Sequence, residues 1–133
     1  MKVLDTTILV DLLRRDPAAR RAIEKLEEEG ALSTTEIGAY ELYLGVQGLG
    51  RRRGTAERAR IDDLLDQMNV LPLERRSAIR AAEIAAHLRK RGQTIGILDL
   101  LTAAIALAHG ADIVITRNVE DFRRIPGLRV EIY

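Results

Sequence analysis

The sequence predicts one α/β domain built around a parallel sheet. Helical and strand patterns alternate along all 133 residues, with no internal repeat and no low-complexity linker. Hydrophobic residues make up 47% of the chain and charged residues 31%, enough to fill one core and to cover it. Residues 112–116, Asp-Ile-Val-Ile-Thr, are β-branched and nearly all apolar, as is typical of a buried parallel strand. A chain of this length predicts a single domain, residues 1–133.

Capping residues and glycines mark the expected helices. Asp16 before Pro17 is a cap followed by a first-turn proline, and Gly30 ends the helix that they begin. Ser33 and Glu36 have the spacing of a capping box, so we expect the next helix to begin near Ser33. The helices are expected at residues 8–13, 17–29, 33–44 and 55–68, in a long segment that ends at 91, and at 99–109.

Short apolar segments between these helices predict the strands, and one basic segment predicts a loop. The strands are expected at residues 3–4, 31–32, 70–73, 112–116 and 128–132. Residues 48–54, bounded by glycines, are expected to form a loop that carries Arg51, Arg52 and Arg53. Such a run is either a solvated surface or a set of RNA phosphate contacts.

Charge and composition exclude several classes of protein. Lys and Arg total 21 against 20 for Asp and Glu, and a net charge of +1 lacks the electrostatic signature of a protein that coats DNA. The absence of cysteine excludes disulfides, thiol catalysis and cysteine-bound zinc, and two histidines cannot build a histidine-rich metal site. Asp5 interrupts the N-terminal segment before any apolar signal core, and no run of 18 apolar residues follows. We therefore expect a cytoplasmic protein that does not enter the membrane.

Three carboxylates stand in apolar surroundings, where an unpaired charge costs several kcal/mol. Asp5 lies where the first strand gives way to a helix, Glu41 lies within an apolar helix, and Asp99 lies between two leucines. A fourth polar segment, residues 116–122, directly follows the strongest strand. If these places converge, their oxygens suit a hard divalent ion, Mg²⁺ or Mn²⁺, better than zinc. Such an ion can activate water and hold a phosphodiester for attack.

Each of these acids also has a purely structural interpretation. Asp5 and Asp99 could cap the helices that follow them, because Asp is a favoured N-cap residue. Glu41 alone could be a helical surface residue. Asp11, with Arg15 four residues further on, is interpreted as half of a surface ion pair.

Four segments resemble the motifs of the PIN-domain family. Residues 3–11 resemble the opening of these domains, in which an Asp ends the first strand and a Thr or Ser follows. Residues 33–45 resemble the second acidic motif, in which the Glu of a Glu-Leu pair comes four residues before a Gly. Residues 97–105 and 115–122 resemble the third and fourth motifs. All four occur in the order of the family, and together they span nearly the whole chain.

The resemblance implies a Rossmann-like, three-layer fold with a central parallel sheet, and a metal-dependent endoribonuclease. It implies that Asp5, Glu41 and Asp99 are the catalytic, metal-binding carboxylates, supported by Thr6 and by the hydroxyl of Thr116.

The fourth motif departs from the family pattern at one position. Many PIN domains have an Asp where this chain has Asn118, which can form hydrogen bonds but adds no charge. Asp121 either supplies the missing acid or stabilises the turn before Phe122.

The size of the chain resembles that of the VapC toxins of toxin–antitoxin systems. The resemblance to them implies a homodimer, an RNA substrate and inhibition by a small VapB-like antitoxin, which often covers the acidic pocket with an arginine. A cation in such a pocket is physically reasonable.

Two rival interpretations come from other classes of protein. A haloacid-dehalogenase-like phosphatase also begins with an Asp at the end of its first strand, but it needs a second Asp where this chain has Thr7. A degenerate PIN-like module would bind RNA or protein without cleavage, and the missing acid at Asn118 favours that alternative. The three retained carboxylates favour the enzyme.

Overall fold

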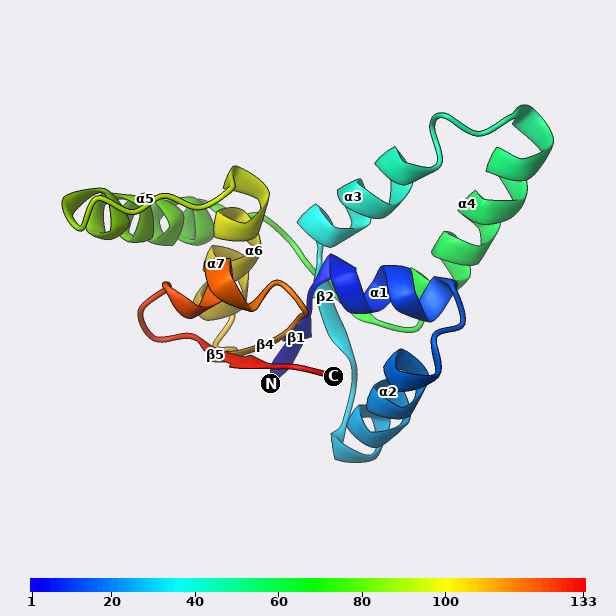
Figure 1. Ribbon diagram of the computed structural model, residues 1–133, viewed down its shortest axis with the longest axis horizontal. Helices are drawn as coiled ribbons and strands as arrows, with labels where there is room; N and C mark the ends of the chain where they lie inside the picture. Colours follow the sequence, from blue (N-terminus) through cyan, green and yellow to red (C-terminus); the bar gives the residue numbers. More distant parts are fainter.

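Five parallel strands form the central sheet of the computed structural model, which describes residues 1–133 (Figure 1). The strands are β1 (Lys2–Leu4), β2 (Ser33–Thr35), β3 (Asn69–Leu71), β4 (Ile113–Ile115) and β5 (Arg129–Glu131). Their order in the sheet is β3-β2-β1-β4-β5, and every neighbouring pair is parallel. The chain thus starts at the centre of the sheet, builds one side of it, and then returns to build the other.

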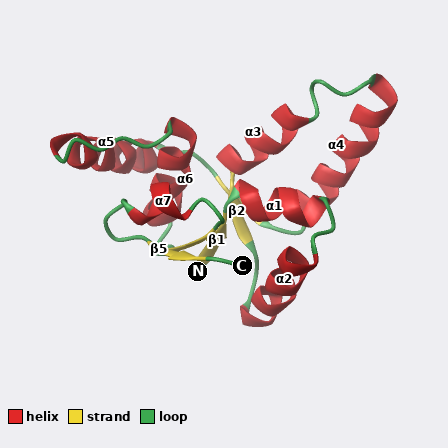
Figure 2. Ribbon diagram, viewed as in Figure 1, coloured by secondary structure: helices red, strands yellow, loops and turns green.

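Helices cover both faces of this sheet and make a three-layer α/β fold, which confirms the expected class (Figure 2). They are α1 (Thr6–Leu13), α2 (Pro17–Glu29), α3 (Glu36–Gly45), α4 (Arg51–Asp66), α5 (Arg75–Lys90), α6 (Ile97–Ala108) and α7 (Val119–Arg123). Figure 1 shows α1 to α4 on one side of the strands and α5 to α7 on the other. None of these helices combines the length and the hydrophobicity that crossing a bilayer requires.

Alternating side chains on the two central strands fill two separate cores. Val3 and Val114 contribute to the core beneath α5, α6 and α7, whereas Leu4 and Ile115 contribute to the core beneath α1 to α4. Consecutive residues of a strand point to opposite faces, so each central strand serves both layers. This double burial explains why β4 is apolar throughout and why β1 is apolar after Lys2.

The second strand is not where the sequence predicted it. Ser33, expected to begin a helix, instead lies in β2 between Val3 of β1 and Asn69 of β3. The helix begins at Glu36, and Thr35 caps it by accepting a hydrogen bond from the amide of Gly38 at 3.1 Å. Ser and Thr side chains serve equally well as helix caps and as buried strand residues, so the local spacing could not decide between the two.

The expected loop at residues 48–54 is also wrong in part. Helix α4 begins at Arg51, with Gly50 at its N-cap position, and therefore includes all three arginines. Gly54 suggested a break because glycine costs about 1 kcal/mol within a helix. Here it lies in the first turn, where its amide donates to the carbonyl of Gly50 at 2.7 Å. The short helix α7 was not expected at all.

Replacing Phe122, the largest side chain that is fully buried, tests the core beneath α7. Phe122→Ala should lower the free energy of unfolding by about 3–5 kcal/mol, because it removes a large apolar side chain and leaves a cavity. Chemical denaturation measures the loss. Ile132→Ala, at a side chain that is 67% exposed, should change stability by less than about 0.5 kcal/mol. Equal effects of the two substitutions would contradict this packing.

Candidate active site

Polar side chains meet at the carboxyl edge of the two central strands. Asp5 follows β1 directly and Thr116 follows β4 directly. The amide of Asp5 donates to the carbonyl of Ile115 at 3.0 Å, which extends the pairing of these strands to the site itself. The chain leaves β1 toward β2 on one side and comes back to β4 on the other. Open parallel sheets place their ligand sites at such a switch point.

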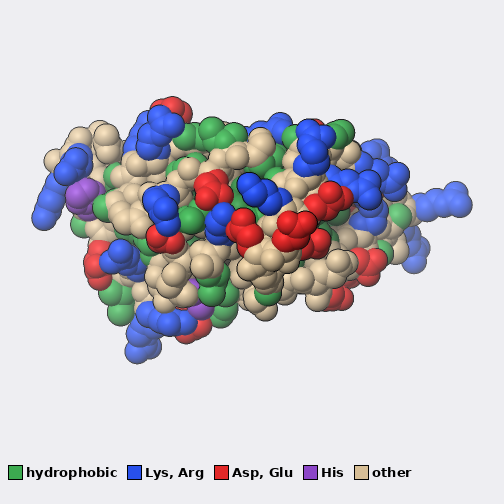
Figure 3. All heavy atoms as spheres, turned by 90° about the horizontal axis from the view of Figure 1, so that it is seen from below, with side chains coloured by type: hydrophobic (Ala, Val, Ile, Leu, Met, Phe, Trp, Pro, Cys, Tyr) green, Lys and Arg blue, Asp and Glu red, His purple; other side chains and the backbone are tan.

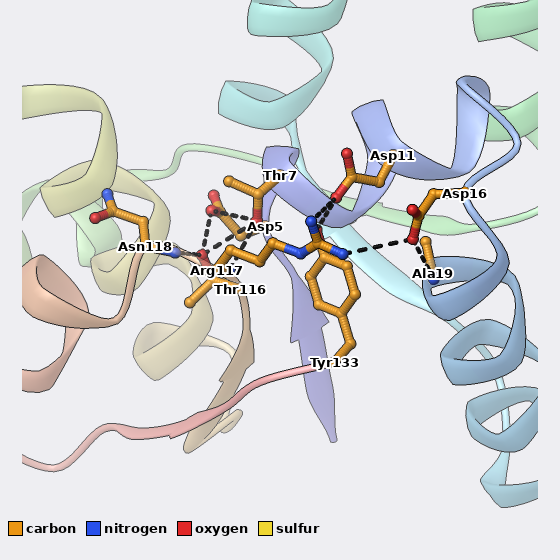
Figure 4. A network of polar contacts seen from close by, with 9 residues as sticks. All are labelled: Asp5, Thr7, Asp11, Asp16, Ala19, Thr116, Arg117, Asn118 and Tyr133. Carbon is orange, nitrogen blue, oxygen red and sulfur yellow. Dashed lines mark hydrogen bonds and ion pairs between the residues drawn. The ribbon is translucent and has the colours of Figure 1, made fainter.

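Asp5 is a buried carboxylate held by hydroxyl groups. It is 3% exposed, and its Oδ2 atom accepts hydrogen bonds from Oγ1 of Thr116 at 2.7 Å and from Oγ1 of Thr7 at 3.4 Å (Figure 4). Although Asp5 occupies the N-cap position of α1, its side chain makes no capping hydrogen bond. The structural interpretation is therefore right about the position of Asp5, but the carboxylate also bonds to Thr116, outside the helix.

Thr116 connects Asp5 to the rest of the site. Its hydroxyl has one proton, which it donates to Asp5, so the same oxygen accepts from the amide of Asn118 at 2.9 Å. The single proton of the Thr7 hydroxyl is shared between Oδ2 of Asp5 at 3.4 Å and Oγ1 of Thr116 at 3.2 Å, and the Thr7 oxygen accepts from the amide of Arg117 at 3.1 Å. These bonds leave Asp5 with one defined orientation.

Glu41 reaches the site from α3. It is half-buried, and its Oε1 atom accepts a hydrogen bond from Oγ1 of Thr6 at 2.8 Å. Gly38, one turn earlier, allows α3 to lie this close to α1. A Cβ atom at Gly38 would stand 3.1 Å from Oγ1 of Thr34 and 3.6 Å from Oγ1 of Thr6. The absence of a side chain at this position thus sets how near Glu41 comes to Thr6.

Asp99 lies on the other side of Asp5, at the third position of α6. Gly96 occupies the N-cap position of that helix, so Asp99 is not its cap. Its Oδ2 atom accepts a hydrogen bond from the side-chain amide of Asn118 at 2.6 Å. Asp121, in the first turn of α7, lies next to Asp99 and can accept a hydrogen bond from it when Asp99 is protonated, and it lies 3.7 Å from Arg124. Both candidates from the fourth motif therefore lie against the same carboxylate.

The carboxylates of the site have raised pKa values. Burial, then the charge of Asp5 and a hydrogen bond that protonated Asp99 donates to the Asp121 carboxylate, raise the pKa of Asp99 from 3.8 to about 7. Burial also raises the pKa of Glu41, to which the charge of Asp5 adds. The negative charge of Asp5 thus disfavours the ionised forms of Asp99 and Glu41. A bound cation would offset this excess of negative charge.

The pKa of Asp5, the most buried of the three carboxylates, is also raised. Burial raises its pKa, and the hydrogen bond from the hydroxyl of Thr116 opposes that rise only in part. None of Asp5, Glu41 and Asp99 forms an ion pair with Lys, Arg or His, although ion pairs occur elsewhere on the chain. Three acids without a cationic partner therefore share one edge of the sheet.

The side chains as they stand do not enclose an ion fully. No three acidic or histidine side chains converge closely enough to bind one ion together. Mg²⁺ does not require this, because it usually keeps several water molecules and is held by one or two carboxylates. The site offers only oxygen donors from carboxylates, hydroxyls and an amide, which suits Mg²⁺ or Mn²⁺ and suits zinc poorly.

Arg117 forms a network beside the site that the sequence did not reveal. Its guanidinium lies 3.4 Å from both Asp11 and Asp16 and 4.6 Å from the centre of the Tyr133 ring (Figure 4). The Tyr133 hydroxyl donates to Asp11 at 2.5 Å. The expected pairing of Asp11 with Arg15 is wrong, because Arg15 lies past the end of α1 with a φ of 61°. Arg117 stands inside the fourth motif, but its partners come from three other elements.

The three consecutive arginines lie in the first turn of α4, and all are exposed. Arg53 lines a cavity of about 450 Å³ that also includes Glu41, so this arginine borders the site, whereas Arg51 and Arg52 line none of the described cavities. On one face of the molecule, Asp and Glu side chains gather near the middle, and Lys and Arg side chains are dense at the end where α4 lies (Figure 3).

Comparison with known proteins finds one family over nearly the whole chain. The sequence model of the PIN domain matches residues 2–128. Ribonuclease VapC2 of Haemophilus influenzae is 30% identical over 132 residues, covering 97% of this chain and 95% of that protein. The tRNA(fMet)-specific endonuclease VapC of Shigella flexneri is 28% identical over 131 residues, with the same coverage. The solved structure of VapBC2 from Rickettsia felis bound to a promoter DNA fragment superposes with a TM-score of 0.89 at 25% identity, covering 99% of this chain and 98% of that one.

The raised pKa of Asp99 predicts how stability depends on pH. The folded state binds this proton more tightly than the unfolded state, so the stabilisation is complete below the ordinary pKa of 3.8 and is lost as pH rises to about 7. In EDTA, the unfolding free energy of Asp99→Asn should fall less than that of the wild type as pH rises to about 7. At alkaline pH the variant should therefore be more stable, relative to the wild type, than it is at acid pH. Denaturation at a series of pH values measures both effects. Asp63→Asn, at an exposed helical position, is the matched control. A slope that Asp99→Asn leaves unchanged would refute the assignment.

Proposed function

Because the chain belongs to the PIN-domain family, we propose that it is an endoribonuclease toxin of the VapC type that hydrolyses RNA with Mg²⁺ or Mn²⁺. We propose further that residues 1–133 form one PIN domain. The observation that carries the proposal is the group of carboxylates at the carboxyl edge of β1 and β4, which have raised pKa values and no cationic partner. That edge is also where the motif residues of the family meet.

In this proposal Asp5, Glu41 and Asp99 hold the metal ion and are the catalytic acids. A bound divalent ion supplies hydroxide at neutral pH and neutralises charge that develops on the phosphate. The hydroxyl of Thr116 keeps the Asp5 carboxylate in one orientation, and Thr6 does the same for Glu41. Such supporting hydrogen bonds make an oxygen ligand available without a change of rotamer.

Asn118 and Asp121 share the task that a single acid performs in many PIN domains. The side-chain amide of Asn118 orients Asp99, and the carboxylate of Asp121 supplies negative charge next to it. The degenerate, non-cleaving alternative drew its support from the missing acid at position 118. An acid that already contacts Asp99 weakens that support.

We propose three partners for the chain. The first is RNA, and because the relative from Shigella flexneri is a tRNA(fMet)-specific endonuclease, initiator tRNA is the first substrate to test. The second is a VapB-type antitoxin, since several solved relatives are VapBC complexes. The third is a second copy of the chain. Tyr40 and Leu44, exposed one turn apart on α3, are large apolar side chains of the kind that dimer interfaces use.

Cleavage of RNA tests the enzyme directly. The purified chain should cut a tRNA pool containing initiator tRNA in Mg²⁺ or Mn²⁺, and EDTA should abolish the reaction. Asp5→Asn and Asp99→Asn should each reduce the rate by more than about a hundredfold, since even the partners of metal ligands are worth up to that much. Gel electrophoresis of labelled RNA measures the rates.

Asp63→Asn removes the same charge from an exposed position of α4 and should cleave at the wild-type rate. Cleavage that survives both EDTA and Asp99→Asn would rule out the proposed site. If the chain binds the metal ion but cuts no RNA, the result would favour the degenerate module that binds without cleavage.

Asn118→Asp tests whether this position faces the metal ion. The new carboxylate would stand against Asp99, where Asn118 now donates a 2.6 Å hydrogen bond. It should strengthen the binding of Mn²⁺ by about tenfold or more, because one added charge at the site is worth at least about 1.4 kcal/mol. Isothermal titration with MnCl₂ measures the change. An unchanged affinity would place residue 118 outside the metal site.

A further inference from the structure

A polar cavity lies between α1 and the loop after β4. Its volume is about 350 Å³, and only one of its lining residues is apolar. The hydroxyls of Thr6 and Thr7 line it together with Glu41, so it opens directly onto the carboxylate site. Two arginines, Arg14 and Arg117, form the basic part of the lining, and its second acid, Asp11, is paired with Arg117. We call this space the α1 cavity.

The two arginines of the α1 cavity differ in how their charge is used. The guanidinium of Arg117 is flanked by Asp11 and Asp16, at 3.4 Å from each, so its charge is already neutralised. Arg14 follows the last residue of α1, is exposed, and takes part in no ion pair or side-chain hydrogen bond. Arg14 is therefore the one cation of the α1 cavity that is free to bind an anion.

We propose that the α1 cavity binds a phosphate group of the RNA strand beside the bond that is cleaved, with Arg14 as its cation. The proposal rests on the proposed function, because it assumes an RNA strand across the carboxylate site. An RNA chain carries a phosphate at every nucleotide, so a strand with one phosphate at the metal must place the next ones close by. A guanidinium binds phosphate oxygens through two parallel N–H groups, which makes arginine well suited to this task.

Arg14 also connects the α1 cavity to a second one. The cavity of about 450 Å³ between α1, α3 and α4 includes Glu41 and Arg14 again, and it extends to Arg53. Arg53 likewise forms no ion pair and is exposed. A strand that contacts Arg14 can thus continue toward the basic first turn of α4.

A segment of a partner protein is the other conceivable occupant. Peptides that dock in grooves rely on apolar anchors, and the α1 cavity offers only Val10. Hydroxyls, a free guanidinium and the adjoining carboxylate site instead match a hydrated, charged ligand. These features favour the phosphate.

Neutralising Arg14 tests the proposal against a neighbour of identical charge. Arg14→Gln and Arg15→Gln remove the same charge from adjacent exposed residues, but Arg15 lines none of the described cavities. Both are made in the Asp5→Asn background, which prevents cleavage. Fluorescence anisotropy then measures the affinity for a labelled single-stranded RNA at a series of NaCl concentrations.

Arg14→Gln should weaken RNA binding by about tenfold, the loss of one hydrogen-bonded contact between charged groups. It should also reduce the dependence of log Kd on log salt by about 0.7, the value for one phosphate of a single strand. Arg14→Lys should keep the salt dependence, and Arg15→Gln should change neither quantity. Equal effects of Arg14→Gln and Arg15→Gln, or none, would overturn the proposal. So would an Arg14→Gln variant that binds RNA normally but releases a co-expressed antitoxin.

The cleavage assay separates this proposal from the proposed function. If the otherwise unmodified chain cuts RNA and Arg14→Gln cuts it with the same KM, the function stands and the phosphate site is wrong. If the unmodified chain cuts no RNA in Mg²⁺ or Mn²⁺, the proposed function itself is wrong.

Discussion

The parallel pairing of β1 with β4 is the interaction on which the rest of the site depends. It brings residues more than a hundred positions apart in the chain side by side, and it ends in the bond from the Asp5 amide to the carbonyl of Ile115. The hydroxyl of Thr116 can then reach the Asp5 carboxylate at 2.7 Å. Because both strands are buried on both faces, neither can shift by one residue without turning core side chains outward. The register of two apolar strands therefore fixes the position of a polar site.

Several acids at one edge of the sheet destabilise the folded state when no metal ion is bound. Burial raises the pKa values of Asp5, Glu41 and Asp99, repulsion from Asp5 adds to the rise for Glu41 and Asp99, and none of the three carboxylates pairs with a Lys or Arg side chain. Hydroxyls and an amide hold the carboxylates in place without neutralising them. An arrangement that is unfavourable alone becomes favourable when a cation binds, which is the usual relation between a strained site and its ligand. A cationic side chain from an antitoxin would relieve the same excess of charge.

A second set of contacts ties the loop after β4 to its surroundings. Arg117 connects that loop to α1 through Asp11, to the start of α2 through Asp16, and to the end of the chain through Tyr133. The same loop carries Thr116 and Asn118, which orient two of the acids. Its charges are matched within the network, which leaves Arg14 as the free cation on that side of the site. Neighbouring arginines thus differ in role because their partners differ.

The sequence alone determined the α/β class and the four motifs, and it singled out the three acids that the structure brings to one edge of the sheet, because buried strands are apolar and a carboxylate in an apolar segment is conspicuous. It could not determine that Ser33 belongs to a strand, since Ser also caps helices and only pairing with β1 and β3 decides between the two. Nor could it reveal the partners of Arg117, which come from distant segments. The local sequence pattern indicates which face of a helix or strand is buried. Contacts between elements depend instead on strand register and on close approach, as at Gly38, and both exist only in the folded chain.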